Sequence, residues 1–98
     1  MWIPVGRISL AKKFYEESEN IPKEKGTWLV LYDFKGIKPS TKYWTNLRRL
    51  IKIAGGGSLV QYSVFTTKEK RVAAVAKKLA EHYGAETIVY KVEKVESI

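Results

Sequence analysis

Hydrophobic and polar positions follow two different periods along the chain, and the shorter period predicts strands. Residues 27–34 (TWLVLYDF) and 58–66 (SLVQYSVFT) are rich in β-branched and aromatic residues, which indicates two buried strands. Residues 86–95 (ETIVYKVEKV) alternate apolar and charged side chains, a pattern typical of an antiparallel or edge strand with one face in water. We expect these three segments to form one sheet.

The helical period appears in the two segments between these strands. Each carries an apolar stripe with spacings of three and four residues, which predicts two amphipathic helices. Glycines 55–57 end the first helix, and Gly84 ends the second. Thr66 and Glu69 have the spacing of a capping box, which predicts that the second helix begins just after Thr66. The stripes consist of Tyr43, Leu47, Leu50, Ile51 and Ala54 in the first segment and of Val72, Val75, Ala76, Leu79 and Tyr83 in the second.

The order strand, helix, strand, helix, strand predicts the fold class. We expect an α+β sandwich, in which a small antiparallel sheet carries two helices on one face. The ferredoxin-like βαββαβ arrangement fits if a short further strand lies between residues 55 and 68. A small all-parallel sheet is the alternative, but it would need cover on both faces, which two helices supply poorly.

Residues 1–26 precede this domain, which spans residues 27–98, and we interpret them as an N-terminal extension and linker. The spacing of Ile8, Ala11, Phe14 and Tyr15 predicts a short helix in the extension. We favour packing of this segment on its own domain, where it would enlarge a small core. The alternative is a docking arm for a protein partner. That arm would use Trp2, Ile3, Phe14 and Tyr15.

Composition narrows the classes of chemistry. The chain has 98 residues, of which 45 % are apolar, enough for one small domain. The absence of cysteine excludes disulfides and thiolate metal sites, and a single histidine, His82, excludes a zinc site built on histidines. No apolar run could span a bilayer, so we expect a cytoplasmic protein with no membrane partner. Abundant Lys and Glu with few amides are typical of thermophiles.

The positive charge of the chain indicates a polyanionic binding partner. The net charge is +8, and residues 35–78 hold eleven basic side chains and one acidic side chain. Such a density is the footprint of a nucleic-acid-binding surface, with solubility through net charge as the alternative. The candidate phosphate contacts are Lys35, Lys38, Lys42, Arg48, Arg49, Lys52, Lys70 and Arg71.

Aromatic residues occur beside this basic block. Exposed rings next to cations could stack on unpaired bases. For Trp28, Phe34 and Phe65 we favour a position in the core, because they lie on predicted strands or at their ends.

Asp33, the only aspartate, follows an apolar strand. A carboxylate in such a position can hold Mg²⁺ together with waters and substrate phosphates. The simpler interpretation, which we favour from the residues alone, is a strand-end carboxylate that caps the loop at residues 35–41.

Three features together resemble a known family. They are the strand end Tyr32-Asp33, the basic pair Arg48-Arg49, and the string VQYSVF at residues 60–65, which is the most specific of the three. On these residues the chain resembles the second CRISPR-associated (Cas-two) family, whose members are small ferredoxin-like homodimers of the spacer-acquisition complex in antiviral defence.

The resemblance covers residues 27–95 and implies a function. It implies a homodimer that binds nucleic acid, with duplex DNA favoured, and an integrase-type protein partner. Several members of the family are Mg²⁺-dependent endonucleases of RNA or DNA. By this resemblance Asp33 would be the catalytic metal ligand, and Ser63 and Phe65 would be motif residues that support the catalytic site.

Departures from the family pattern indicate a divergent member. The family begins almost at its first strand, whereas 26 residues precede it here, and residues 66–68 lead directly into a predicted helix. We therefore rank nucleic-acid binding above catalysis. One aspartate per protomer makes a poor metal site unless Glu side chains or backbone carbonyls supply further ligands. The alternatives are a non-catalytic regulatory or architectural module that acts through protein partners, and a basic protein that binds nothing specific.

Overall fold

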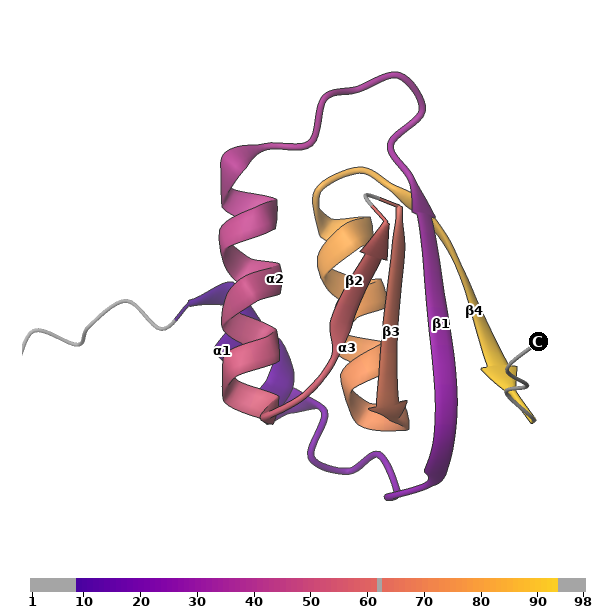
Figure 1. Ribbon diagram of the computed structural model, residues 1–98. Coiled ribbons are helices and arrows are strands. Elements are labelled where there is room, and N and C mark those ends of the chain that lie inside the picture. Colours follow the sequence, from indigo (N-terminus) through magenta and orange to yellow (C-terminus); the bar gives the residue numbers. More distant parts are fainter. Residues whose placement is uncertain (1–8, 62, 94–98) are drawn as a thin grey trace, which may run out of the picture.

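The computed structural model describes residues 9–61 and 63–93, which form seven helices and strands (Figure 1). Together they make an α+β fold, as the sequence predicts. In chain order the elements are α1 (Leu10–Glu17), β1 (Lys25–Asp33), α2 (Thr41–Ala54), β2 (Ser58–Gln61), β3 (Val64–Glu69), α3 (Lys70–His82) and β4 (Glu86–Val92). None of the helices in these described ranges is long and apolar enough to cross a membrane.

The sheet has four strands in the order β2-β3-β1-β4, and every neighbouring pair is antiparallel. The all-parallel alternative is therefore wrong. β1 lies in the middle, where Leu31 is opposite both Val64 of β3 and Ile88 of β4. β1 begins at Lys25 rather than at Thr27, so part of the expected linker belongs to the sheet.

The single strand predicted at residues 58–66 is wrong, because the structure has a hairpin there. β2 and β3 pair with each other, with Ser58 opposite Thr66, and residues 66–68 continue β3 instead of leading directly into a helix. The segment lacks the Asn-Gly or Asp-Gly signal that usually marks a tight hairpin, so its apolar pattern looks continuous. The hairpin supplies the further strand between residues 55 and 68.

The two predicted amphipathic helices form where the apolar stripes lie. α2 begins after Ser40, whose side-chain oxygen accepts a hydrogen bond from the Tyr43 backbone N–H at 3.2 Å, and ends at Gly55 in the left-handed conformation (φ 72°). The predicted capping box is wrong. α3 begins at Lys70 without a side-chain cap, and the Thr66 hydroxyl instead donates to the carbonyl of Trp28 on β1, at 3.2 Å.

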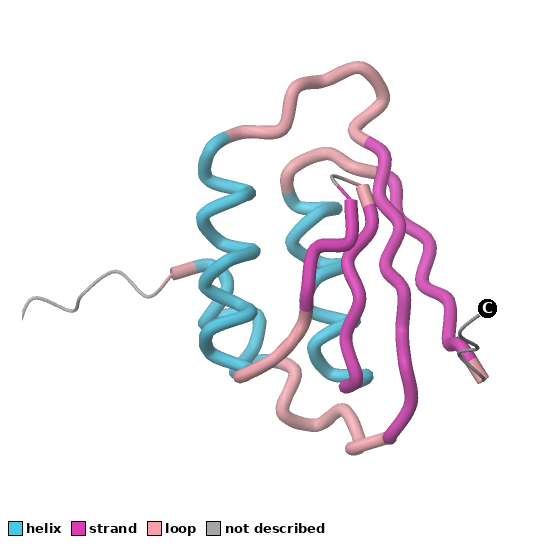
Figure 2. Tube along the Cα trace, viewed as in Figure 1, coloured by secondary structure: helices cyan, strands magenta, loops and turns pink. Residues whose placement is uncertain are grey.

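All three helices lie on one face of the sheet (Figure 2). α1 confirms the short helix predicted in the N-terminal segment, and it packs against α2 and α3. Its Ala11 and Phe14 are buried in the same core as Val30 and Phe65 of the sheet. The described part of the N-terminal segment thus enlarges the core, as we favoured. A docking arm cannot use Phe14, and Trp2 and Ile3 lie outside the described residues.

Buried Asn46 joins the three helices through hydrogen bonds. Its side-chain oxygen accepts the backbone N–H of Ala11 on α1 at 3.0 Å. Its amide nitrogen donates to the carbonyl of Lys42 at 2.9 Å and to the Tyr83 hydroxyl at 3.1 Å. A buried amide with its oxygen and both N–H groups bonded stabilises this arrangement, because each of these groups would otherwise lose its water without replacement.

The opposite face of the sheet is left open by the helices. Along β1, Trp28, Val30 and Tyr32 are buried beneath the helices, so the alternate residues Leu29 and Leu31 point to the other side. On β4, Ile88 and Tyr90 are opposite Leu31 and Leu29 and belong to the same open face, where they are 54 % and 52 % exposed.

Candidate functional site

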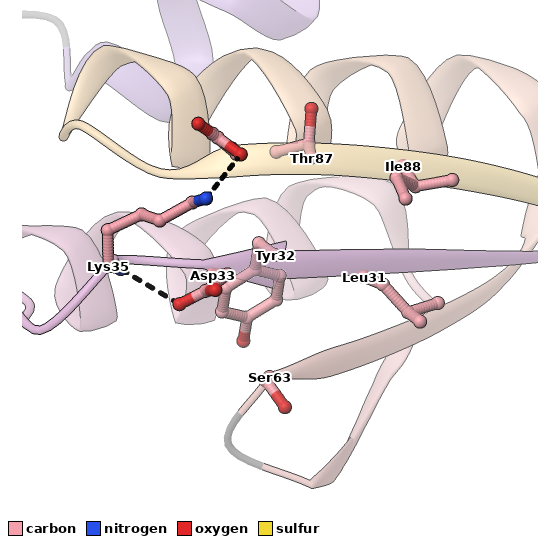
Figure 3. A pocket seen from close by; sticks show the side chains of 8 residues that line it. Leu31, Tyr32, Asp33, Lys35, Ser63, Thr87 and Ile88 are labelled. Atoms are coloured by element: carbon pink, nitrogen blue, oxygen red, sulfur yellow. Dashed lines mark hydrogen bonds and ion pairs between the residues drawn. The ribbon is translucent and has the colours of Figure 1, made fainter.

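A pocket of about 520 Å³ lies at the C-terminal end of β1 (Figure 3). Its walls come from β1, the loop after β1, the turn between β2 and β3, and the start of β4. The lining residues are Leu31, Tyr32, Asp33, Lys35, Ser63, Glu86, Thr87 and Ile88. The pocket therefore contains two of the three residues that the family resemblance assigns to the catalytic site.

Asp33 is exposed and closes the turn after β1. Its Oδ1 accepts a hydrogen bond from the Lys35 backbone N–H at 2.8 Å. Lys35 and Gly36 both have positive φ angles (54° and 79°), and the Ile37 N–H donates to the carbonyl of Phe34 at 3.0 Å. This is the Asx-type capping that we favoured from the sequence, and it leaves Oδ2 available to another ligand.

Glu86 is the residue of this pocket that sequence analysis missed. In the β1–β4 pairing it is directly opposite Asp33, on the same face of the sheet. The ammonium of Lys35 lies 3.1 Å from Glu86 Oε2, so Lys35 contacts both carboxylates, one through its backbone and one through its side chain (Figure 3). The hydrogen bond to Glu86, and then the charge of that carboxylate, raise the pKa of Lys35 above its usual value.

Ser63 and Phe65 differ in burial and only Ser63 lines the pocket. Ser63 is exposed in the turn before β3, its carbonyl accepts the Tyr32 N–H at 3.1 Å, and it lines the same pocket as Asp33. Phe65 is opposite Val30 beneath the helices and is fully buried. Its side chain contributes to the core and cannot touch a substrate in the pocket. Trp28 and Phe34 are also buried, which confirms the core positions we favoured for the three aromatic residues.

The donor set of the pocket is small. Within residues 9–61 and 63–93, no three side chains of His, Cys, Asp or Glu come together in a way that could hold a metal ion. Asp33 and Glu86 are two carboxylates, one of them contacted by an ammonium. Tyr32, which also lines the pocket, adds no negative charge, because burial raises its pKa, as it does for the neighbouring Tyr43.

Apart from Lys35, which is paired with Glu86 in the pocket, the predicted phosphate contacts form two groups. Lys42, Arg48, Arg49 and Lys52 are exposed on the face of α2 opposite its buried residues, and α2 contains no acidic residue. None of these four side chains forms an ion pair with a carboxylate of the described residues. Lys38, in the loop before α2, is exposed and unpaired in the same sense.

Lys70 and Arg71 lie at the other end of the sheet from Asp33. They directly follow Glu69, the last residue of β3, which pairs with Lys25 at the start of β1, whereas Asp33 ends β1. Lys70 is exposed, whereas the Arg71 guanidinium stacks 3.7 Å from the ring centroid of Tyr15. Arg71 also donates to the Ser18 hydroxyl at 2.9 Å and to the Tyr15 carbonyl. Arg71 thus joins α3 to α1, apart from the α2 surface.

Comparison with known proteins identifies no relative from which a function could be inferred. No family model matches the chain, and no curated protein or solved structure is significantly similar to it. Two features of the molecule bear on function: the carboxylate pocket at the end of β1 and the basic face of α2.

Proposed function

We propose that the chain is a nucleic-acid-binding homodimer, related to the Cas-two family, that contacts phosphates through the exposed face of α2. The observation that carries this proposal is that Lys42, Arg48, Arg49 and Lys52 lie on a helix without acids and form no ion pair with any carboxylate of the described residues. Each phosphate that such a cation neutralises releases counterions, which favours binding at moderate salt.

Two lysines outside α2 provide a contrast. Lys77 is paired with Glu81 at 2.8 Å, and Lys91 with Glu24 at 3.2 Å. A surface that is charged only for solubility would be expected to mix both signs throughout. From Lys42 to Lys52 the α2 cations span roughly 15 Å along the helix axis at the usual rise per residue. A row of this length suits the backbone of a duplex, and we favour DNA because the family resemblance does.

The order of elements supports the relation to the family. Without α1, the chain runs β1-α2-β2-β3-α3-β4. This succession, with the sheet order β2-β3-β1-β4, corresponds to the ferredoxin-like βαββαβ arrangement. In this interpretation α1 is an addition to that arrangement.

The open face of the sheet supports the homodimer. Ile88 and Tyr90 are more than half exposed there, beside Leu29 and Leu31. An apolar surface of this kind marks an interface, and a two-fold axis would bury the same residues of both protomers. It would also bring the two pockets toward each other. If the face instead binds a different protein, the chain acts as the partner-dependent module considered from the sequence, and the isolated chain is a monomer.

The Mg²⁺ that the resemblance implies can be tested against the pocket. Mg²⁺ in nucleotide-processing sites takes one or two carboxylates and fills its other positions with water and substrate phosphate. Asp33 and Glu86 fit such a site, provided that the Lys35 ammonium moves away from Glu86. When bound, Mg²⁺ would supply charge neutralisation at a phosphodiester and an activated water. We rank this endonuclease activity second to binding, and the integrase-type partner and the cytoplasmic location stay predictions.

Paired variants test the two parts of the proposal. We expect the wild type to bind labelled duplex DNA in a fluorescence-anisotropy titration, and Arg49→Gln/Lys52→Gln to bind at least about ten-fold more weakly, because two charge-assisted contacts are lost. Lys12→Gln/Lys13→Gln removes the same charge from exposed positions on α1 and is expected to bind like the wild type. Equal losses in both double variants would contradict a specific role of α2.

Cleavage is measured in the same samples with Mg²⁺ or EDTA. Asp33→Asn is expected to keep DNA binding. If cleavage occurs in the wild type and disappears in Asp33→Asn, the endonuclease activity is supported. Binding without cleavage in either protein leaves a structural nucleic-acid-binding protein.

A further inference from the structure

A second pocket, of about 410 Å³, lies at the end of the molecule away from Asp33. It forms where the segment after α1, the start of β1, the end of β3 and the start of α3 meet. We call it the corner pocket. Neither the family resemblance nor the proposed contact surface on α2 accounts for it.

Five basic side chains from two stretches of the chain, residues 23–25 and 68–71, line the corner pocket: Lys23, Lys25, Lys68, Lys70 and Arg71. The four lysines are exposed, and none of them forms an ion pair with a carboxylate of the described residues. Cations that converge on one cavity without internal partners repel one another, so an anion that enters the pocket relieves this repulsion.

Three glutamates also line the pocket and reduce its positive charge. Glu24 is already paired with Lys91 at 3.2 Å, whereas Glu19 and Glu69 are exposed. The cations therefore outnumber the acids, and the excess is larger once the charge of Glu24 is assigned to Lys91. The positive end of the α3 dipole adds to this field, but the cavity and its cations carry the inference.

The Arg71 side chain is fixed in position by contacts with α1 and the residue that follows it. It is stacked on Tyr15 and bonded to Ser18 and to the Tyr15 carbonyl, so its guanidinium loses little freedom when a ligand arrives. These two hydrogen bonds use two of its five N–H donors, which leaves three for an anion. A guanidinium presents such donors in the geometry that matches phosphate.

The size and floor of the pocket indicate more than an inorganic ion. Half-buried Tyr15 and Ile21 supply apolar surface beside the cations. A volume of about 410 Å³ lies within the usual range for small organic ligands. The combination of a cationic rim and an apolar floor fits a molecule that joins a phosphate to a flat apolar group.

We propose that the corner pocket binds an organic phosphate of mononucleotide size. Its phosphate would contact Lys68, Lys70 and Arg71, and its apolar part would lie against Tyr15 and Ile21. The ligand could be a free nucleotide or the phosphorylated end of a nucleic-acid strand, since both present the same chemistry. The inference does not depend on the α2 surface, so either proposal can fail while the other stands.

The test is calorimetric titration of the full chain with adenosine monophosphate, adenosine and inorganic phosphate. We expect saturable binding of adenosine monophosphate at one site, weaker binding of inorganic phosphate, and no measurable binding of adenosine. Lys68→Gln/Lys70→Gln, at two exposed positions, should lower the affinity at least about ten-fold. Lys12→Gln/Lys13→Gln is the matched control and should bind as the wild type does.

The outcomes separate the interpretations. Absence of saturable binding, or an equal loss in both double variants, would overturn the proposal. Amide chemical shifts that move near Ile21 and Arg71 would support it, whereas shifts confined to α2 would contradict it. A short oligonucleotide with and without a terminal phosphate identifies the source: if only the phosphorylated form competes with adenosine monophosphate, the pocket also accepts strand ends.

Discussion

Asp33 and Glu86 are directly opposite each other in the β1–β4 pair, on the open face of the sheet, and Lys35 contacts both. Two carboxylates in such a cross-strand pair repel each other, and a nearby cation reduces this repulsion. In the free protein Asp33 accepts the Lys35 backbone N–H, and the cation beside Glu86 is the Lys35 ammonium, at 3.1 Å. A divalent ion that enters the pocket would have to take its place.

Lys35→Gln should therefore increase the affinity of the pocket for Mg²⁺. Removing one positive charge from the pocket is expected to tighten Mg²⁺ binding by about five-fold, since a nearby unit charge at an exposed site contributes on that scale. The measurement is the rise in melting temperature with added Mg²⁺, compared between the variant and the wild type. Lys77→Gln removes a similarly paired lysine away from the pocket and serves as control. If Mg²⁺ shifts all three proteins equally, the pocket is not a metal site.

Glu81 gives the pH dependence that the structure predicts. Its carboxylate accepts hydrogen bonds from Lys77 at 2.8 Å and Thr87 at 3.1 Å, and Lys77 in particular lowers the pKa of Glu81 below its usual 4.5. Because the folded pKa is depressed, the stabilisation is complete above about pH 4.5 and is lost as pH falls through the folded pKa. Because Lys77 and Glu81 are partly exposed, we expect their interaction to contribute less than about 1 kcal/mol to the free energy of unfolding. Urea unfolding from neutral to acid pH should show a shallower fall for Glu81→Gln than for the wild type, and parallel curves would refute the assignment.

Gly57 is required by the aromatic core. Its φ is 106°, and a Cβ placed on it would lie 2.7 Å from Cζ of fully buried Phe65. Gly57→Ala is expected to destabilise the fold by about 1–3 kcal/mol, through backbone strain and overpacking. Gly56→Ala is the control, because a Cβ there meets nothing within 4 Å. Chemical denaturation of both variants checks this, and equal stabilities would show that Phe65 can move aside.

The open face predicts the oligomeric state. We expect Tyr90→Lys to convert the dimer to a monomer in sedimentation-velocity experiments, because it places a charge among apolar residues of the proposed interface. Ile37→Lys changes an apolar residue that is 61 % exposed in the loop before α2, and it should leave the dimer intact. A wild-type protein that stays monomeric at all accessible concentrations would rule out the homodimer.

Local patterns predicted most of the helices and strands, because those elements follow the apolar period of the chain. The stripe from Tyr43 to Ala54 indicates α2, and Gly55 ends it in the conformation that glycine favours. The local pattern predicts one strand at residues 58–66, and the further strand between residues 55 and 68 entered only as a condition, because strand pairing, and not a local turn signal, creates the hairpin at residues 58–69. The Thr66 hydroxyl illustrates this: its partner is the carbonyl of Trp28, far along the chain.

The sequence predicts only those parts of the site that neighbouring residues determine. Asp33 stands out as a lone carboxylate at a strand end, and the loop that it caps follows directly. Glu86 becomes relevant only through the register of β1 with β4, and the burial of Phe65 only through the register of β1 with β3. Likewise, nothing local shows that Arg71 stacks on Tyr15. Such long-range pairings are determined by packing of the whole sheet and its helices.

The most direct test of the central claim is the salt dependence of duplex DNA binding. For the wild type, the logarithm of the binding constant should fall linearly with the logarithm of salt concentration, with a slope of about −0.9 for each phosphate contacted. Arg49→Gln/Lys52→Gln should reduce this slope by about 2, and Lys12→Gln/Lys13→Gln should leave it unchanged. An unchanged slope in the α2 variant, or no binding at low salt, would contradict the claim that the basic face of α2 binds nucleic acid.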